Sequence, residues 1–239
     1  MTPLEQLKAL LNERYVTEDE NEYQVVLSEG LTDEQIDRLA AQLPQSRIPP
    51  DIRELLQFAA GFEFDPVEQV TFDGVGQFGL ENIFPHSVQL AGDGYGNFWI
   101  LDVDKEGEWG NVFFVGHDPA VVVKQSENLT EFIQHLDEFG KKGPASNLDR
   151  VHEEICPRIF HKEDGFIDVV PARASGDPVL KAFATGLPDH FVIADLRGKP
   201  NHSGFAWGKY GPHIEHAVRH EHELLWGFEK KGGIFKRFR

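Results

Sequence analysis

Three histidines near the C-terminal end have the spacing of a possible metal site. His213, His216 and His220 fall at positions i, i+3 and i+7. A helix would place all three on one face, where their imidazole nitrogens could bind zinc together with a carboxylate such as Glu223. The run His-Glu-His at residues 220–222 also fits the alternation of a strand, and the chain has no HExxH motif. We therefore expect no metal and no cofactor, and a histidine cluster that faces solvent or a partner.

The chain offers little for nucleophilic or paired-carboxylate catalysis. Its single cysteine, Cys156, follows two glutamates without an activating base nearby in sequence, and no serine lies in a G-x-S-x-G motif. One cysteine also excludes an intramolecular disulfide and a cysteine-based zinc site. Asp102 and Asp104 form a carboxylate pair of the kind that an acidic chain contains by chance. These residues predict a protein that is not an enzyme.

The tail at residues 230–239 mixes basic side chains with Phe235 and Phe238. Proteins that bind single-stranded nucleic acid use such mixtures for backbone and base contacts. An exposed hairpin edge protected by Lys and Arg has the same composition, and we favour it. We expect no nucleic-acid partner.

A glycine-rich stretch, GDGYGN at residues 92–97, has some features of a phosphate-binding loop. A dinucleotide fingerprint needs G-x-G-x-x-G between a strand and a helix, but here the sixth position is Asn97 and the following NFWILDV has strand character. Asp93 would also place a carboxylate against a phosphate. The stretch therefore predicts a sharp turn that leads into a buried strand.

The elements that position these residues begin with three helices. Thr2 and Thr32 each start a capping box, and Pro50 stands near the start of the third helix. Apolar residues at helical spacing then predict helices over residues 2–14, 31–43 and 49–60, with Gly61 as a left-handed cap.

Strand character dominates the middle of the chain. We predict strands over residues 23–27, 67–72, 97–103, 111–116 and 120–125, the last two joined as a hairpin. An amphipathic helix follows over residues 129–139, with Gly140 beyond its end. This order predicts an α+β fold, an antiparallel sheet with helices packed on one side.

The remaining residues predict a C-terminal α+β extension. Expected elements are a helix within residues 147–160, a short helix from Asp177-Pro178 to near Gly186, strands over residues 190–196 and 204–209, and a hairpin over 223–239 that turns at 231–233.

Charge divides the chain into two parts. Residues 1–146 hold 27 acidic and 9 basic residues, whereas residues 147–239 hold 13 acidic and 14 basic residues and eight of the eleven histidines. The shift predicts a boundary near the polar stretch 140–147, with one domain over residues 1–146 and an extension or small second domain over 147–239. An acidic surface repels nucleic acid and anionic membranes, so we expect a partner with a basic surface.

Bulk composition is that of a globular protein. The chain has 239 residues, of which 40% are hydrophobic and 26% are charged. No stretch approaches the roughly 18 apolar residues of a membrane span, and the N-terminal residues do not have the pattern of a signal peptide. We expect a cytoplasmic protein with no membrane partner.

Several segments in order resemble the SUKH superfamily, in particular its Smi/Knr branch, named for a yeast cell-wall regulator. The matching segments are RIPPDIRELLQFAAGFEF, LENIFP, GDGYGNFWILDV, NVFFVGHDP and NLTEFIQHL, which together extend over residues 47–139. Within this family the glycine-rich turn looks like a scaffold element. The turn departs from the more uniformly glycine-rich form of many relatives, and residues 147–239 match no motif of the family.

The resemblance implies an α+β fold without a known catalytic apparatus. Bacterial members are associated with polymorphic toxin systems as immunity proteins, which bind and neutralise a toxin such as a nuclease, an ADP-ribosyltransferase or another enzyme acting in the cytoplasm. Two alternatives stay open: a regulatory scaffold like the eukaryotic relatives, and, with less support, a metal-dependent enzyme housed in residues 147–239.

We predict that acidic and aromatic residues of loops bind the partner, because aromatic side chains anchor interfaces and charges set specificity. Trp109 is the strongest single candidate, since a Trp within an acidic turn has no evident core role. The predicted partner-binding residues are Glu63, Asp65, Glu68, Asp73, Glu81, Asp93, Tyr95, Asp104, Glu106, Glu108 and Trp109.

Overall fold

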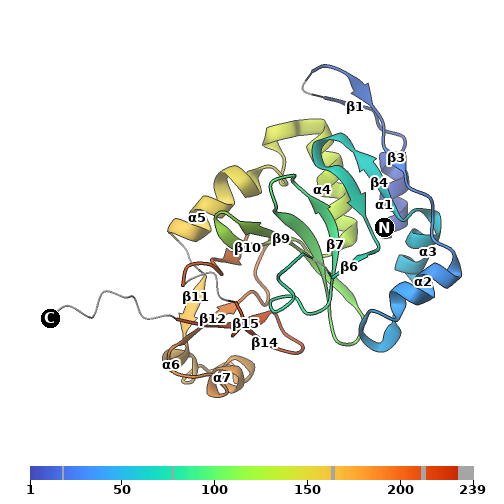
Figure 1. Ribbon diagram of the computed structural model, residues 1–239. Helices are drawn as coiled ribbons and strands as arrows, with labels where there is room; N and C mark the ends of the chain where they lie inside the picture. The colour runs from blue at the N-terminus through green and yellow to red at the C-terminus, as the bar shows by residue number, and fades with distance from the viewer. Residues whose placement is uncertain (18, 77, 163–164, 211–213, 231–239) are drawn as a thin grey trace.

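A six-stranded antiparallel sheet forms the centre of the molecule (Figure 1). The computed structural model describes residues 1–17, 19–76, 78–162, 165–210 and 214–230. The strand order is β13-β10-β9-β8-β7-β6. Their bounds are β6 Gly74–Val75, β7 Ser87–Gly92, β8 Phe98–Val103, β9 Trp109–His117, β10 Ala120–Ser126 and β13 Gly204–Phe205.

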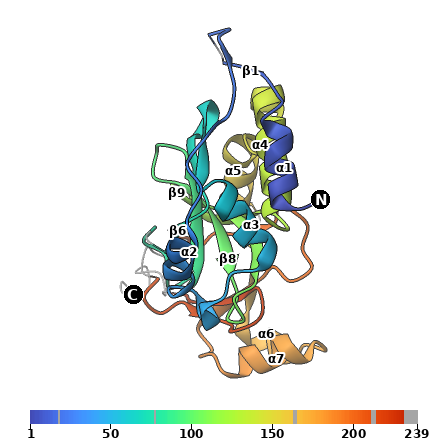
Figure 2. The same cartoon turned by 90° about the vertical axis from the view of Figure 1, so that its right-hand side faces the viewer.

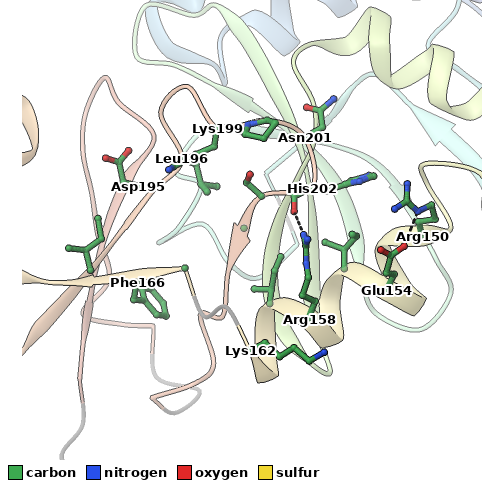
Figure 3. Close-up of a pocket in the computed structure, with 17 residues that line it drawn as sticks. Arg150, Glu154, Arg158, Lys162, Phe166, Asp195, Leu196, Lys199, Asn201 and His202 are labelled. Atoms are coloured by element: carbon green, nitrogen blue, oxygen red, sulfur yellow. Dashed lines mark hydrogen bonds and ion pairs between the residues drawn. The ribbon is translucent and has the colours of Figure 1, made fainter.

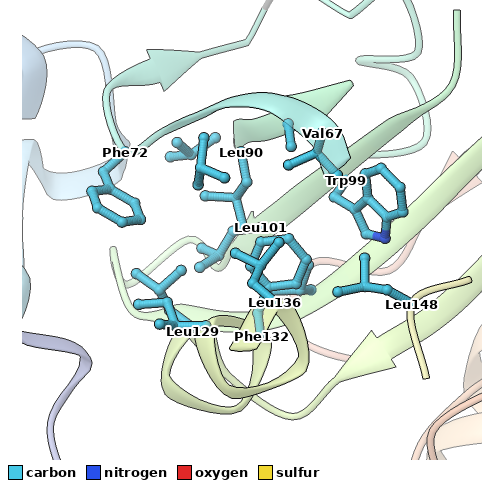
Figure 4. Close-up of a cluster of buried hydrophobic side chains, with 14 of the residues drawn as sticks. Val67, Phe72, Leu90, Trp99, Leu101, Leu129, Phe132, Leu136 and Leu148 are labelled. Carbon is cyan, nitrogen blue, oxygen red and sulfur yellow. The ribbon is translucent and has the colours of Figure 1, made fainter. Parts of the chain in front are cut away.

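Helices from the N-terminal part, residues 1–146, cover one face of this sheet. They are α1 Pro3–Leu10, α2 Asp33–Ala40, α3 Pro50–Phe58 and α4 Leu129–Lys142. Leu101 of β8 lies beside Phe132 and Leu136 of α4 in the core (Figure 4). Thr2 and Thr32 form the predicted capping boxes, and the predicted α+β fold with helices on one side of the sheet is confirmed.

Strands from the C-terminal part, residues 147–239, form a second antiparallel sheet of order β11-β12-β15-β14, which covers the other face. Leu148, Val151 and Ile159 instead pack in the core on the first face, together with α4. The strands are β11 Phe166–Asp168, β12 Phe191–Asp195, β14 Val218–Arg219 and β15 Leu225–Glu229. Trp226 packs against Phe84 and Phe113, with ring centroids 5.8 and 6.1 Å away. Residues on both sides of the predicted boundary near residue 146 therefore share a core.

Two short helices, α6 Val169–Ala172 and α7 Pro178–Thr185, pack on the outer face of the second sheet. The layers are thus helices, sheet, sheet and helices, and Figures 1 and 2 both place α6 and α7 at the far end of the molecule from α1 and α4. Asp177 caps α7, as predicted.

Shorter elements complete the fold. The strands β3 Val26–Leu27, β4 Gly61–Phe64 and β5 Glu68–Thr71 form a three-stranded sheet, and β1 Tyr15–Val16 pairs with β2 Glu22–Tyr23. Further helical turns are η1 Pro44–Ser46, η2 Asp65–Val67, η3 Gly143–Ala145, the π-helix η4 Val151–Ile155 and the α-helix α5 Cys156–His161. Within the described ranges, no helix combines the length and apolar character needed to cross a membrane.

Two predicted helix ends are wrong, and in both cases a glycine serves close packing instead. Gly61 lies in β4, where an added Cβ would stand 2.2 Å from the Val70 carbonyl oxygen. Gly140 lies inside α4, which continues to Lys142, and an added Cβ would stand 2.3 Å from the Tyr15 ring. The first helix also ends earlier than predicted, at Leu10.

The strands β4, β7 and β11 escaped prediction because their sequences are short and lack clear alternation. β15 is the first strand of the predicted C-terminal hairpin. The turn itself and the basic tail after Lys230 lie outside the described residues.

Candidate partner-binding surface

The glycine-rich turn between β7 and β8 is held in shape by its own aspartate. The Asp93 carboxylate accepts hydrogen bonds from the backbone N–H of Tyr95 at 2.9 Å and of Asn97 at 3.1 Å, and from the Asn97 side chain. Gly94 and Gly96 have φ angles of 74° and 87°, which glycine adopts without a Cβ clash. Asp93 occupies amides that a phosphate would need, so the predicted sharp turn into a buried strand is confirmed.

Tyr95 projects from this turn into solvent. Its side chain is 83% exposed, while its backbone is fixed by the bond to Asp93. A large aromatic side chain on a rigid, exposed turn has the properties of an interface anchor, because little conformational entropy is lost when it is buried.

Asn97 connects this turn to the neighbouring one between β9 and β10. Its Oδ1 accepts a hydrogen bond from the His117 backbone N–H at 3.0 Å and lies 2.9 Å from His117 Nδ1. Asp118 directly follows His117 and is exposed. The two turns therefore form one continuous edge at this end of the sheet.

A cavity of about 460 Å³ opens beside Tyr95, and we call it the acidic cavity. Its apolar lining includes Val67, Trp99 and Leu148, which lie near one another in Figure 4. Its carboxylates are those of Asp93, Asp118, Asp149 and Glu153. Among the described residues that line it, there is neither Lys nor Arg. This arrangement favours a basic ligand group with an apolar stem, as in Lys and Arg side chains.

His152 also lines the acidic cavity, where it lies between a carboxylate and two aromatic rings. Its Nδ1 lies 3.9 Å from Asp93 Oδ2, and its ring packs edge-on against Phe114 and Trp99 at 4.7 and 5.7 Å. The π-helix η4 carries this side chain. This side chain therefore forms part of the wall of the acidic cavity.

Comparison with known protein families gives one match for this chain. Residues 30–135 match the SMI1 / KNR4 family (SUKH-1). This match covers less than half of the chain, and we call the matched residues the SUKH-1 domain. The match extends from the residue before Leu31 into α4 and includes the β7–β8 turn with Tyr95. The comparisons with curated proteins and with solved structures gave no match.

The structure distributes the predicted partner-binding residues over three places on the SUKH-1 domain. Around the β4–β5 and β7–β8 turns lie Glu63, Asp65, Glu68, Asp93 and Tyr95. At the hairpin between β8 and β9 lie Asp104, Glu106, Glu108 and Trp109. Asp73 and Glu81 flank the edge strand β6. The Tyr95 turn and the β8–β9 hairpin are at opposite ends of β8, separated by roughly 20 Å at about 3.3 Å per residue.

Acidic residues at the β8–β9 hairpin already have partners within the protein. Glu108 pairs with Arg47 at 2.5 Å, and Glu106 Oε1 lies 3.5 Å from His222 Nδ1. Lys105 pairs with Glu221 at 3.0 Å. Glu108 is thus compensated within the N-terminal part by Arg47, while the C-terminal part contributes the acid Glu221 and the imidazole of His222 to this end.

Trp109 is half-buried and packs against the main core, opposite Val103. Its Nε1 is buried without a hydrogen-bond partner. Contacts with the core therefore bury a large part of this side chain, contrary to the expectation that Trp109 has no core role. Tyr95 is the more exposed of the two predicted aromatic anchors.

A buried ion pair beneath this hairpin escaped prediction. Arg219 Nη2 donates to Asp102 Oδ2 at 2.7 Å, and its guanidinium lies 4.0 Å from the Trp226 ring. Burial raises the pKa of Asp102, while the adjacent Arg219 opposes that rise. No sequence signal points to this pair, because its members are 117 residues apart.

The described residues do not form the helix that would have aligned the three histidines. Val218 and Arg219 form β14, and His213 lies outside the described residues. His220 Nδ1 instead accepts hydrogen bonds from the backbone N–H of His222 at 3.1 Å and of Glu223 at 3.2 Å. Across the described ranges, no group of three or more His, Cys, Asp or Glu is placed to hold a metal ion.

The lone cysteine is packed in the core. Burial raises the pKa of the Cys156 thiol to about 12. Because the thiolate is the reactive form, this side chain is unreactive near neutral pH.

Proposed function

We propose that this protein is an immunity protein that binds a cognate bacterial toxin and neutralises it by covering the toxin's active surface. The observation that carries the proposal is the acidic cavity beside the exposed Tyr95 on a SUKH-1 domain. Bacterial members of the superfamily are associated with toxin neutralisation. A toxin that acts on nucleic acid or nucleotides needs a basic active surface, which an acidic partner can cover.

Tyr95 would act as the central anchor, with Asp118 and Glu153 pairing with Lys or Arg side chains of the toxin. Glu63, Asp65 and Glu68 extend the acidic surface along β4 and the β4–β5 turn, where all three are exposed. Glu68 has a φ of 59°, which is rare for a residue with a Cβ. Backbone of this kind is frequent at binding sites, because the surrounding fold fixes the side-chain direction.

The proposed action is stoichiometric and takes place in the cytoplasm, with no cofactor, no reaction and no nucleic-acid or membrane partner. The toxin would be a nuclease, an ADP-ribosyltransferase or another enzyme acting in that compartment.

Calorimetry with the product of the gene immediately upstream tests the proposal. We expect tight binding in an equimolar complex at low salt and weaker binding at high salt, because screening slows the association of oppositely charged surfaces. Absence of binding at both salt concentrations would contradict the immunity function and favour a regulatory scaffold.

Variants separate the acidic cavity from acidity in general. We expect Tyr95→Ala and Glu153→Lys each to raise the Kd by about tenfold or more, since hot-spot and paired-charge losses commonly exceed 1.4 kcal/mol. Glu54→Lys, an exposed position on α3, makes the same change of charge and should alter the Kd by less than about twofold. Equal effects of Glu153→Lys and Glu54→Lys would place the interface elsewhere.

A further inference from the structure

A second cavity, of about 670 Å³, lies in the C-terminal part of the chain. The helices η4 and α5 form one side, and residues 195–204 with the start of β11 form the other (Figure 3). All of its lining residues lie outside the SUKH-1 match. We call it the basic cavity, because its lining includes Arg150, Arg158, Lys162 and Lys199.

The basic cavity keeps a surplus of positive charge within a chain of net charge -17. Its lining also includes Glu154 and Asp195, but each already has a guanidinium partner. Arg150 Nε donates to Glu154 at 2.9 Å, and Arg197 Nη2 donates to Asp195 at 2.7 Å. Among the described lining residues, the carboxylates therefore leave the positive charges of Lys162 and Lys199 available to a ligand, and both side chains are exposed.

Buried hydrogen bonds fix the loop that carries Lys199. The Lys124 side chain, only 3% exposed, donates from Nζ to the Lys199 carbonyl oxygen at 2.9 Å. The His202 backbone N–H donates to the Lys124 carbonyl oxygen at 2.8 Å, and the His202 carbonyl accepts from Arg158 Nη2 at 3.0 Å. The cavity wall is thus held in place before any ligand arrives.

Two backbone features of the cavity, one on each wall, are uncommon. His202 has a φ of 66°, a left-handed conformation that costs energy for a residue with a Cβ. The second feature is on the opposite wall, where the π-helix η4 carries Glu154 and Ile155. Turns of a π-helix are rare in proteins, and those that occur are often at functional sites. The fold maintains both features where the cavity is formed.

An apolar surface lies across from Arg158 and Lys162, on the wall that also carries Lys199 (Figure 3). Figure 3 shows Phe166 and Leu196 on one side of the cavity and Arg158 and Lys162 on the other. The Phe166 ring packs against rings of the core between the two sheets. Its centroid lies 5.9 Å from that of the Phe205 ring, in a tilted arrangement. A ligand that fills this cavity therefore needs a charged part and an apolar part.

We infer that the basic cavity binds a nucleotide, with its phosphates toward Arg158 and Lys162 on one wall and its base toward Phe166 and Leu196 on the wall that also carries Lys199. Lys and Arg recognise phosphate oxygens through charge-assisted hydrogen bonds, and flat bases pack on aromatic and aliphatic side chains. The volume is within the range of small-molecule sites. This inference is independent of the proposed toxin binding, because none of its residues lines the acidic cavity.

Calorimetry of the full-length protein with ADP, inorganic pyrophosphate and adenosine tests the inference. We expect ADP to bind at a single site, pyrophosphate to bind about tenfold more weakly, and adenosine to bind more weakly still. Pyrophosphate and ADP binding equally would remove the base from the proposal, and absence of ADP binding would overturn it. An oligonucleotide that binds more tightly than ADP would also overturn it in favour of a nucleic-acid surface.

Paired variants locate the site. Lys162→Gln combined with Lys199→Gln should raise the Kd for ADP by about tenfold or more, without changing the thermal unfolding of the free protein. Lys8→Gln combined with Lys181→Gln removes the same charge from exposed positions elsewhere and should leave the Kd within about twofold. Equal losses in both double variants would show non-specific attraction and overturn the site.

Discussion

At the residue scale, Asp93 and Tyr95 have opposite tasks within the same turn. Asp93 turns inward and accepts hydrogen bonds from the turn, whereas Tyr95 turns outward and makes no described core contact. Sequence alone placed both on the partner-binding surface. The structure separates a side chain that shapes the turn from one that the turn displays.

Stability measurements distinguish these tasks. We expect Asp93→Ala to lower the free energy of unfolding by about 1–3 kcal/mol, because several polar groups lose their partner. Tyr95→Ala should change it by less than about 0.5 kcal/mol, as is usual for exposed side chains. Urea denaturation of the two variants checks both values, and a large loss for Tyr95→Ala would show that the ring has a structural role.

The Asp102–Arg219 pair provides a second prediction at this scale. Arg219→Met should lower the free energy of unfolding by about 3–5 kcal/mol, because it leaves a buried carboxylate without its partner. In an Asp102→Asn background the same substitution should cost much less. A double-mutant cycle by urea denaturation measures the difference, and equal losses in the two backgrounds would assign the effect to the Trp226 contact instead.

Buried histidines predict the response of stability to pH. Burial lowers the pKa of His135, and the nearby Glu131 and Glu138 oppose this lowering. Burial also lowers the pKa of His202 and of His220. Below about pH 6.5 the unfolded chain binds protons that the folded protein does not, so stability falls as the pH falls.

Unfolding in urea at pH 7.5, 6.5 and 5.5 measures this slope, which is at most about 1.4 kcal/mol per pH unit for each such histidine. We expect His135→Gln to reduce the slope relative to the natural protein. An equal slope in the natural protein and in His135→Gln would contradict the contribution of His135.

At the scale of elements, α4 shows why a glycine was misread as a helix end. Gly140 brings α4 against the Tyr15 ring, whose hydroxyl donates to Asp137 one turn earlier at 2.9 Å. Helix propensity alone would favour alanine at this position by about 1 kcal/mol. The neighbouring ring reverses that preference.

We therefore expect Gly140→Ala to destabilise the protein by about 1–3 kcal/mol, the usual cost of overpacking a core. Gly186→Ala, at the C-terminal end of α7 where an added Cβ would have ordinary contacts, should be nearly neutral. Thermal unfolding of both variants checks this expectation. A stabilised Gly140→Ala protein would mean that Tyr15 moves aside at little cost.

At the scale of the whole molecule, the central sheet unites the two parts of the chain. β13 of the C-terminal part pairs with β10, and Trp226 donates from Nε1 to the Ile83 carbonyl oxygen at 2.9 Å. Apolar side chains from both parts form the core between the two sheets. Loss of packing there should weaken both parts together.

Trp226→Phe tests this coupling. We expect a loss of about 1–3 kcal/mol from the missing hydrogen bond and the smaller ring. Urea unfolding followed by far-UV circular dichroism and by tryptophan fluorescence should give coincident transitions in the natural protein and in the variant. Two separate transitions would show that the parts unfold independently.

Charge is also organised at this scale. The acidic cavity lies at one end of β8, while at the other end Arg219 of the C-terminal part pairs with Asp102 and Arg47 of the N-terminal part pairs with Glu108. The basic cavity lies wholly within the C-terminal part. Net charge along the sequence predicted an acidic surface, and the packing of the two parts decides which acidic residues remain for a partner.

The sequence by itself determined the local elements: the capping boxes at Thr2 and Thr32, the hairpin of β9 and β10, and the sharp turn before β8. These elements depend on interactions between residues a few positions apart, and such interactions can be predicted from the spacing of apolar residues and from the residue types found in caps and turns. Only the tertiary structure decided that Arg219 neutralises Asp102, that Gly140 serves packing, and that Tyr95 rather than Trp109 is fully displayed. The physical reason is that burial and charge pairing depend on residues distant in the chain, whose meeting no local pattern specifies.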